Sequence, residues 1–433
     1  MRPVYIGLIG AGTVGRGVID SIVENGKLIA DRTGVSIVLK AVCDKDVEAL
    51  NSITGIEGLV KTDKADEIIN NEEIDIVVEL IGGVHPAKDI IVDALAGKKH
   101  VVTANKALLS GHWKDIFKTA LDNGVYINFE ASVGGGIPII RAISESFVSN
   151  DLELIYGILN GTTNFILTMM ADQEYSFDKA LAVARKKGIA EPDPKLDING
   201  QDSAHKLVIL ALLGFGIDIS PDDIYTEGIQ NISPQDIKCA RQWGYSIKLL
   251  AIAKKTQKGL QLRVHPTLLP ARHLLANVKG EYNAIFVKGD FIGDSLLYGK
   301  GAGRRPTASS VMGDIVELAK HVAFSGKESY VPYKPLYAPG SIPVVNEEDI
   351  NIPFYLRFSA IDRPGVLAGI SSVLAENEIS IASMSQEERK KGQPVPVIML
   401  THNAREGSMR KAVKQIDKME FVTDKTVVIR IEQ

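Results

Sequence analysis

The chain has little of what marks secreted, membrane-bound or nucleic-acid-binding proteins. It has only 2 cysteines in 433 residues, which excludes a disulfide framework, and Cys43 and Cys239 fall in apolar patterns typical of buried core residues. No apolar run reaches the length of a membrane-spanning helix, and the first expected strand begins almost at Met1, so we expect neither an anchor nor a signal peptide. These features predict a cytoplasmic protein.

Charge of neither sign dominates. The chain has 49 basic and 53 acidic residues, a net charge of −4, and no basic tract that would follow a phosphate backbone. We therefore expect neither nucleic acid nor a membrane as a partner. The length of 433 residues suits two or three domains with substantial cores, as in an ordinary soluble enzyme.

The amino terminus contains the pattern of a dinucleotide-binding turn. An apolar strand at 4–9 leads into the sequence GAGTVG, which is followed by apolar residues at helical spacing. Gly10 permits the tight turn, Gly12 lets a pyrophosphate approach the backbone, and Gly15 allows the helix to pack closely on the strand. Amides at the helix start would hold the phosphates. The predicted cofactor contacts in this turn are Gly10, Ala11, Gly12, Thr13, Val14 and Gly15.

A second expected strand, at 35–43, ends at Asp44. An acid here would accept hydrogen bonds from the adenosine ribose hydroxyls, which favours NAD over NADP. Lys45 could instead meet a phosphate, so either cofactor remains open, and Asp44 could also be a simple turn residue.

The rest of the amino-terminal part alternates between strand and helix patterns. Strands are expected at 76–81 and 100–103, and helices at 86–95 and 105–121, which predicts a doubly wound, Rossmann-like parallel sheet. Loops at the carboxyl ends of these strands should face the cofactor. Lys106 lies near a helix start, where the helix dipole disfavours a cation, so it is a candidate site residue; an exposed lysine is the alternative.

The segment from Ala184 to Lys206 is dense in acids. Pro192, Pro194 and Gly200 interrupt any continuous helix, so we expect the acids before residue 200 on a loop. Asp202 begins an apolar-periodic run and should lie in the first turn of a helix, with Lys206 one turn later on the same face. The alternative is a solvated loop followed by an exposed ion pair.

Two glycine-containing segments follow the amino-terminal sheet. Backbone carbonyls of the Gly134–Gly136 turn, together with Glu130, could ligate a hard cation, although an interdomain hinge fits equally well. Further on, a strand leads into Gly161, Thr162 and Thr163 at a helix start, which suits a bound carboxylate or plain helix capping.

The carboxyl-terminal part differs in composition. Prolines at 332, 335, 339 and 343 indicate a linker, and from Phe354 the pattern is strand, helix, strand, then a polar KKGQ turn, strand, helix, strand. Two such units predict a ferredoxin-like module. Its DRPGVL loop at 362–367 could bind an amino acid, or the module could serve only dimerisation.

Together these motifs resemble the homoserine dehydrogenase family in its longer form, which carries a carboxyl-terminal ACT regulatory domain. The similarity covers essentially the whole chain and includes the segments NGTTN at 160–164, TANK at 103–106 and GKGAGRRPTASS at 299–310. The family signature is matched by Ala184, Gly188, Ile189, Ala190, Asp193, Pro194, Asp197, Gly200, Asp202 and Lys206.

The resemblance implies reversible NAD- or NADP-dependent interconversion of L-homoserine and L-aspartate 4-semialdehyde, a branch step towards threonine, methionine and isoleucine. It implies Lys206 and Lys106 at the reacting centre. Implied substrate contacts are Gly161, Thr162, Gly188, Glu191, Asp197 and Asp202. Further implied cofactor contacts are Thr103, Lys106 and Gly303. An implied Na⁺ or K⁺ site comprises Glu130, Val133, Gly135 and Ile137. An implied effector, threonine, would bind at Asp362, Pro364, Gly365, Val366 and Leu367.

The expected domain organisation follows from these segments. We expect a Rossmann-like cofactor domain at 1–135 and an α+β catalytic and dimerisation region at 136–325, of which 299–325 returns to the cofactor domain. A linker at 326–351 and an ACT domain at 352–433 would follow. The resemblance further implies a homodimer or homotetramer.

The residues also make chemical sense of that activity. Oxidising a primary alcohol needs a proton acceptor at the hydroxyl and a hydride acceptor at the carbon. A neutral Lys206 would accept the proton, Lys106 would stabilise the oxygen, and Glu191 and Asp202 would receive the substrate's amino group. Acidic neighbours favour the charged form of a lysine, which opposes this role unless desolvation or the second lysine offsets them.

Two other functions remain open on sequence grounds. One is a non-catalytic amino-acid sensor with a nucleotide-binding fold and an ACT module, and the other is a dehydrogenase for a different amino alcohol. The pairing of Asp202 with Lys206 favours an enzyme, because a sensor would have no need for it.

Overall fold

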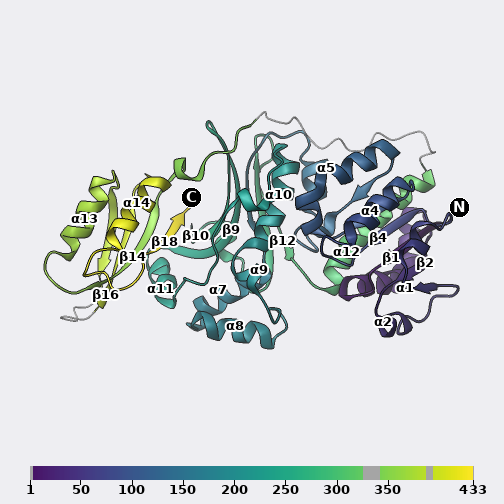
Figure 1. Cartoon of the computed structure of the whole chain (residues 1–433), viewed down its shortest axis with the longest axis horizontal. Coiled ribbons are helices and arrows are strands. Elements are labelled where there is room, and N and C mark those ends of the chain that lie inside the picture. Colours follow the sequence, from purple (N-terminus) through teal and green to yellow (C-terminus); the bar gives the residue numbers. More distant parts are fainter. Residues whose placement is uncertain (1–2, 325–341, 387–393, 433) are drawn as a thin grey trace. The chain divides into compact units, whose positions relative to one another are not determined.

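The computed structural model describes residues 3–324, 342–386 and 394–432, and the chain forms two compact units (Figure 1). Unit 1 comprises Met1–Asp151, His205–Pro221 and Gly289–Pro339, and unit 2 comprises Leu152–Ala204, Asp222–Lys288 and Gly340–Gln433. The helix α10, Gln201–Phe215, contributes residues to both.

Unit 1 is built on a parallel sheet with the strand order β3-β2-β1-β4-β5-β6. Its strands are β1 Val4–Ile9, β2 Ile37–Cys43, β3 Val60–Thr62, β4 Ile76–Glu79, β5 His100–Thr103 and β6 Ile127–Asn128. This order is that of a dinucleotide-binding Rossmann fold, so the predicted doubly wound sheet is confirmed. The second strand begins two residues later than expected, because Gly34 ends the preceding helix with φ 73° and the Val35 amide donates to Thr33 Oγ1 at 3.2 Å.

Helices cover the sheet of unit 1. They are α1 Thr13–Thr33, α2 Val47–Asn51, α3 Ala65–Ile69, α4 Ala87–Ala96, α5 Lys106–Asn123, α6 Ile139–Arg141 and α12 Arg304–Phe324. Unit 1 also contains the short helical turns η1 Glu130–Ser132 and η2 Ala142–Ser146 and the strand β12 Gly293–Lys300, which is not part of this sheet. Although α12 lies far along the chain, it packs against α1, and its residues Val311 and Ile315 join the buried core of the sheet. Burial of these apolar side chains is what holds α12 on the sheet.

Unit 2 contains a mixed sheet with the order β11-β7-β9-β10-β18-β14-β16-β15, and β8 pairs with β10. Its strands are β7 Leu152–Ile158, β8 Tyr225–Thr226, β9 Tyr245–Thr256, β10 Gly259–Pro270, β11 Tyr282–Gly289, β14 Phe354–Ile361, β15 Ile381–Gln386, β16 Pro394–Thr401 and β18 Val427–Ile431. Its helices are α7 Gly161–Gln173, α8 Phe177–Lys186, α9 Lys195–Ile198, α11 Pro234–Gln242, α13 Val366–Glu376 and α14 Glu406–Ile416.

The carboxyl-terminal module confirms the predicted ferredoxin-like pattern. Its antiparallel strand order is β18-β14-β16-β15, and α13 and α14 lie next to each other over it, as Figure 1 shows in its yellow-green part. Phe354, Leu356 and Phe358 point from β14 into the core beneath the two helices.

The final strand joins this module to the rest of unit 2. Besides β14, β18 pairs in parallel with β10, where Arg430 lies beside Thr267. The carboxylate of Glu432 then pairs with Arg263, and both side chains are buried. The module is therefore an extension of one continuous sheet.

Part of the predicted linker, residues 326–341, and the predicted KKGQ turn lie outside the described residues. Where the chain is described again, Leu260 donates to the Pro343 carbonyl at 2.8 Å and accepts from the Val345 amide at 2.9 Å, so this segment is fixed beside β10. Within the described ranges, none of the helices combines the length and apolarity that crossing a bilayer requires.

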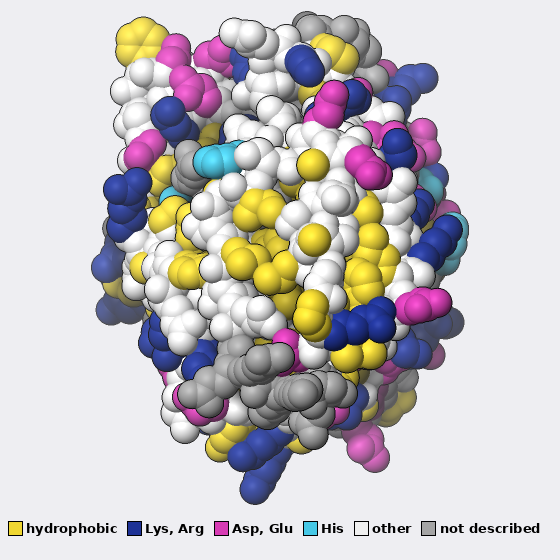
Figure 2. Space-filling view, turned by 90° about the vertical axis from the view of Figure 1, so that its left-hand side faces the viewer, with side chains coloured by type: hydrophobic (Ala, Val, Ile, Leu, Met, Phe, Trp, Pro, Cys, Tyr) yellow, Lys and Arg dark blue, Asp and Glu magenta, His cyan; other side chains and the backbone are white. Residues whose placement is uncertain are grey.

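Figure 2 looks onto the end of unit 2 that carries the carboxyl-terminal module. Hydrophobic side chains gather in the middle of this face, and charged side chains lie mainly around it. The strand β15 ends the sheet, and its Met384 is 49% exposed. An edge strand and an apolar face of this kind are surfaces on which another chain can pair.

Candidate active site

The glycine turn after β1 has the geometry that a dinucleotide requires. Gly10 adopts φ 103°, and a Cβ atom there would lie 2.7 Å from the Leu80 carbonyl. A Cβ on Gly15 would lie 2.0 Å from the Gly10 oxygen, whereas one on Gly12 would meet no atom within 4 Å. Gly12 also supplies no capping side chain to α1. The open space and the uncapped helix start fit a bound pyrophosphate, so the residues present fit NAD or NADP.

Asp44 braces this turn. Its Oδ2 accepts from the Ala11 amide at 2.6 Å and its Oδ1 accepts from the Asp46 amide at 2.9 Å. The contact with the Asp46 amide makes Asp44 a turn residue, which is the alternative role that the sequence left open for it. Because each carboxylate oxygen has a second lone pair, contact with a ribose hydroxyl stays a prediction.

A buried network shapes the loops after β4 and β5. Glu79, 0% exposed, accepts from the Ile81 amide at 2.8 Å and from Thr103 Oγ1 at 2.6 Å. Thr103 Oγ1 accepts from the Asn105 amide at 3.1 Å, and Asn105 Oδ1 caps α5 by accepting from the Leu108 amide at 3.1 Å. The network fixes Lys106 as the first residue of α5. Sequence reasoning missed Glu79 and Asn105, although an asparagine just before a helix is a capping signal.

The two candidate lysines lie on helices that a hydrogen bond joins within unit 1. Ser110, one turn after Lys106 on α5, has its Oγ 2.7 Å from Nδ1 of His205, which directly precedes Lys206 on α10. Lys206 is 8% exposed, so it is not the solvated surface lysine that the alternative required.

The acids of the sequence signature meet in unit 2. Asn160 Nδ2 donates to Asp197 Oδ1 at 2.7 Å and to Asp202 Oδ2 at 2.9 Å. Asp202 lies in the first turn of α10, as predicted, and is 8% exposed. Sequence reasoning did not identify Asn160 as their common partner, since it lies 37 and 42 residues away from them.

The loop predicted for the acids before residue 200 is only partly correct. Asp197 lies in the one-turn helix α9, which begins directly after Pro194. Proline is tolerated at a helix start because its missing N–H would have no intrahelical partner there. Asp193 is exposed and lies 3.7 Å from exposed Lys195, so the solvated interpretation fits this acid.

The start of α7 connects to the turn after α8. Thr162 Oγ1 donates to the Ile189 carbonyl at 3.1 Å, and Gly188 turns the chain there with φ 69°. A Cβ on Gly161 would lie 2.6 Å from the Glu281 oxygen, so only glycine fits at this helix start. Glu191 follows the same turn and is exposed. Gly161, Thr162 and Gly188 are therefore brought together, with Glu191 two residues beyond Ile189.

Glu130, the predicted cation ligand, lies in η1 and is buried. Its carboxylate accepts from the Ile140 amide at 2.8 Å and the Arg141 amide at 2.9 Å, and burial raises its pKa. The Gly135 carbonyl accepts from Ser310 Oγ at 2.6 Å. Each of these oxygens keeps a lone pair that a monovalent cation would use, which leaves cation binding a prediction. Over the described residues no cluster of His, Cys, Asp or Glu is arranged to hold a metal ion.

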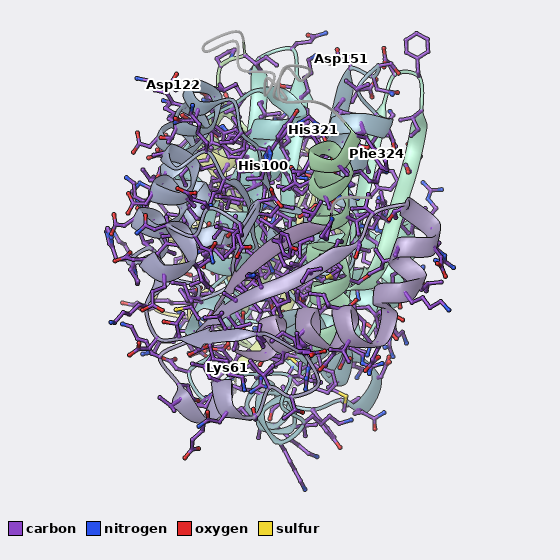
Figure 3. The ribbon with its side chains drawn as sticks, turned by 90° about the vertical axis from the view of Figure 1, so that its right-hand side faces the viewer. Lys61, His100, Asp122, Asp151, His321 and Phe324 are labelled. Carbon is purple, nitrogen blue, oxygen red and sulfur yellow. The ribbon has the colours of Figure 1, made fainter. Side chains whose placement is uncertain are left out.

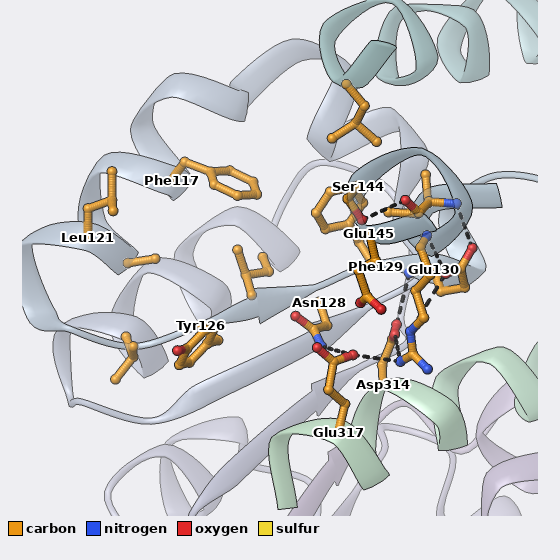
Figure 4. A pocket seen from close by; sticks show the side chains of 16 residues that line it. Phe117, Leu121, Tyr126, Asn128, Phe129, Glu130, Ser144, Glu145, Asp314 and Glu317 are labelled. Carbon is orange, nitrogen blue, oxygen red and sulfur yellow. Dashed lines mark hydrogen bonds and ion pairs between the residues drawn. The ribbon is translucent and has the colours of Figure 1, made fainter. Parts of the chain in front are cut away.

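Beside Glu130 lies a cavity of about 120 Å³ (Figure 4). Asp314 and Glu317 of α12 form one wall, where Arg141 pairs with both carboxylates at 2.9 Å and Asn128 Nδ2 donates to Glu317 at 3.2 Å. Burial raises the pKa of Asp314 to about 8, against the opposing effect of Arg141. The predicted cation contacts Val133 and Ile137, a few residues after Glu130, are buried. The predicted cofactor contact Gly303 is exposed and directly precedes α12, with φ 120°.

The DRPGVL loop lines a separate cavity of about 270 Å³ in the carboxyl-terminal module. All five predicted effector contacts line it, together with Gln386 of β15. Gly365 has φ 91° directly before α13, a conformation that side chains of other residues rarely permit.

The comparisons with known proteins agree along the whole chain. Family models described as the NAD binding domain of homoserine dehydrogenase, homoserine dehydrogenase, and the ACT domain match residues 10–130, 138–316 and 354–421. The chain is 41% identical over 437 residues to a homoserine dehydrogenase from Pseudomonas aeruginosa, covering 100% of both.

Solved structures are similar as well. A homoserine dehydrogenase from Thiobacillus denitrificans has a TM-score of 0.93 and 42% identity, covering 100% of this chain and 99% of that one. A hyperthermophilic archaeal homoserine dehydrogenase mutant in complex with NADPH has a TM-score of 0.63 and 26% identity, covering 73% of this chain and 97% of that one. The chain therefore belongs to the homoserine dehydrogenase family, with a Rossmann-type NAD-binding domain and a carboxyl-terminal ACT domain.

Proposed function

We propose that the chain oxidises L-homoserine reversibly to L-aspartate 4-semialdehyde, with Lys206 as general acid and base and Lys106 assisting. The observation that carries the proposal is on α10, where Asp202 and Lys206 lie one turn apart and are each 8% exposed. Burying a lysine and an aspartate costs free energy, which a surface role would not require.

In this proposal the chain's own residues bind the substrate and move one proton. Lys206 takes the proton from the hydroxyl and returns it in the reverse direction, while Lys106 holds the oxygen. NAD or NADP, when bound, supplies the hydride acceptor.

We assign the recognition of the amino acid part to unit 2. Asp202, Asp197 and Glu191 receive the ammonium group, and the amides at the start of α7, at Gly161 and Thr162, receive the carboxylate, with Gly188 leaving room beside them. The ammonium and carboxylate groups on the Cα atom of an amino acid carry opposite charges, which match a pair of carboxylates and a helix start.

The cofactor assignment covers Gly10–Gly15, Asp44, Thr103, Lys106 and Gly303. The position of Asp44 after β2 supports NAD, because its carboxylate would repel the additional phosphate of NADP. We also propose that a Na⁺ or K⁺ ion binds at Glu130 and at the carbonyls of Val133, Gly135 and Ile137.

Regulation is assigned to the carboxyl-terminal module, with threonine as effector in the cavity at the DRPGVL loop.

The apolar face and the edge strand β15 support association into a homodimer or homotetramer. We propose functional domains at 1–135, 136–325 and 352–433, with a linker at 326–351 between the second and the third. Buried thiols at Cys43 and Cys239 suit the cytoplasm, where cysteines remain reduced.

The test is the absorbance of the reduced nicotinamide when purified protein is mixed with homoserine and either NAD or NADP. The proposal predicts steady turnover with homoserine and a lower KM for NAD than for NADP. A non-catalytic sensor would bind the cofactor, visible as fluorescence transfer, without any turnover. A dehydrogenase for another amino alcohol would turn over that substrate with a higher kcat/KM than homoserine.

A further inference from the structure

Asn160 makes two separate sets of contacts through the two ends of its side chain. It is 5% exposed and is the N-cap residue of α7, where its Oδ1 accepts from the Thr163 amide at 2.9 Å. A backbone amide can only donate, so this contact fixes which end of the side chain is the oxygen. The NH₂ group must then face Asp197 and Asp202.

One NH₂ group therefore holds two carboxylates from two different helices. Asp197 comes from α9 and Asp202 from α10, and each accepts one of the two amide hydrogens, at 2.7 and 2.9 Å. Two like charges this close repel each other, and the amide hydrogens offset part of that repulsion. A carboxylate can accept several hydrogen bonds at once, so a pair of carboxylates is a suitable site for a primary ammonium.

Backbone contacts also hold the acidic segment. The Ile198 carbonyl accepts from the Ile229 amide at 2.9 Å. A Cβ on Gly228 would lie 2.2 Å from the same Ile198 oxygen and 2.7 Å from Asn199 Cα. The turn between α9 and α10 thus packs directly on residues 228–229.

We propose that Asn160 is a positioning residue for the substrate's ammonium group, and this proposal rests on the function proposed above. It does not touch the reacting carbon. It spaces Asp197 and Asp202 so that a primary ammonium fits between them, which selects 2-amino acids over the corresponding acids that lack the amino group. A primary ammonium has three donors, so it can bond both carboxylates at once.

Two substitutions separate this role from helix capping. Serine and aspartate are both good N-cap residues, so Asn160→Ser and Asn160→Asp keep the start of α7 but remove the amide donor. For Asn160→Ser we expect KM for homoserine to rise about 10-fold, which corresponds to about 1.4 kcal/mol, while KM for the cofactor stays within about twofold. The preference for homoserine over its analogue without the amino group should shrink by a similar factor.

Asn160→Asp adds a pH signature that a structural role would not produce. A third carboxylate beside two others is harder to ionise, and once protonated its hydroxyl can donate as the amide did. We expect KM for homoserine to be high at alkaline pH and to fall towards the wild-type value as the pH is lowered, whereas Asn160→Ser shows no such recovery.

Ser176→Ala is the matched control. Ser176 caps α8 by accepting from the Lys179 amide at 3.4 Å and contacts neither acid, so this variant should unfold at a lower temperature with an unchanged KM for homoserine. A wild-type KM in both folded Asn160 variants would overturn the positioning role alone, as would a parallel rise of KM for substrate and cofactor. Absence of homoserine turnover by the wild type would instead overturn the proposed function, and this role with it.

Discussion

Ser110 Oγ lies 2.7 Å from His205 Nδ1, which joins the helix that begins at Lys106 to the helix that carries Lys206. Ser110 is 6% exposed, so water cannot readily replace the contact. Because the two residues are 95 positions apart, the bond fixes the relation of two distant segments.

The first prediction is that Ser110→Ala lowers kcat for homoserine about tenfold while KM for the cofactor changes little. Losing the hydroxyl leaves α5 and α10 less well aligned, and a small misplacement of catalytic groups has a large effect on rate. Steady-state kinetics measure both constants. Ser144→Ala is a control, since Ser144 Oγ donates to the Ile140 carbonyl at 2.7 Å, within the same segment of the chain. Wild-type kcat in Ser110→Ala would contradict the alignment role.

The second prediction concerns the glycine turn. Gly12→Ala should keep the wild-type unfolding temperature, because its Cβ meets no atom within 4 Å, yet it should weaken NAD(P) binding at least tenfold by filling the space above the turn. Gly15→Ala should instead unfold at a lower temperature, since its Cβ would lie 2.0 Å from the Gly10 oxygen. Thermal unfolding and cofactor titration distinguish the two. Normal cofactor affinity in Gly12→Ala would contradict the assignment.

The sequence allowed the local features to be predicted. The strands β1 and β5 have the predicted ends and β14 begins at Phe354 as predicted, because a proline, a glycine or a charged residue adjoins each apolar run on at least one side. The glycine turn was predictable because strand, turn and helix are contiguous. Lys106 and Asp202 lie at helix starts, as their local patterns indicated.

The long-range contacts could not be predicted. Nothing near Asn160 shows that its NH₂ group reaches Asp197 and Asp202, and nothing near Glu79 shows that it accepts from Thr103. Such contacts depend on how helices and strands pack, which a local pattern does not encode. The short helix α9 was missed for a different reason: proline was taken to exclude helix, although it is tolerated at a helix start.

The third prediction concerns acid stability. His100 Nδ1 accepts from the Tyr126 amide at 3.1 Å, and burial, with a smaller effect from His321, lowers the pKa of His100 from 6.5 to about 4. Figure 3 shows His100 near His321 at the end of α12, where the ring centroids are 5.7 Å apart. The unfolded chain binds more protons than the folded chain between these values, so His100 should reduce stability as the pH falls from about 6.5 to about 4.

Replacing His100 by asparagine tests this, because the amide oxygen can still accept from Tyr126. The free energy of unfolding of the variant should depend less on pH across this window than that of the wild type, by on the order of 2 kcal/mol. Denaturant unfolding at several pH values measures it. Parallel profiles for the two proteins would show that His100 is not held neutral.

The fourth prediction concerns the attachment of the carboxyl-terminal module. Glu432 pairs with Arg263, which is 1% exposed, and Lys254 reaches the same carboxylate at 3.0 Å. Glu432→Ala should lower the free energy of unfolding by about 3–5 kcal/mol, because it leaves a buried guanidinium without this carboxylate. Glu153→Ala, at an ion pair whose two side chains are each about half exposed, is the control and should cost about 1 kcal/mol or less. Equal losses in the free energy of unfolding of the two variants would contradict the claim that the buried ion pair contributes more to stability than the half-exposed one.

The most direct test of the central claim is the initial rate of homoserine oxidation by Lys206→Ala, compared with the wild type and with Lys118→Ala, an exposed lysine of α5. If Lys206 accepts the proton, kcat should fall at least about 100-fold in Lys206→Ala and remain at the wild-type value in Lys118→Ala. A folded Lys206→Ala protein with near-wild-type kcat would contradict the account.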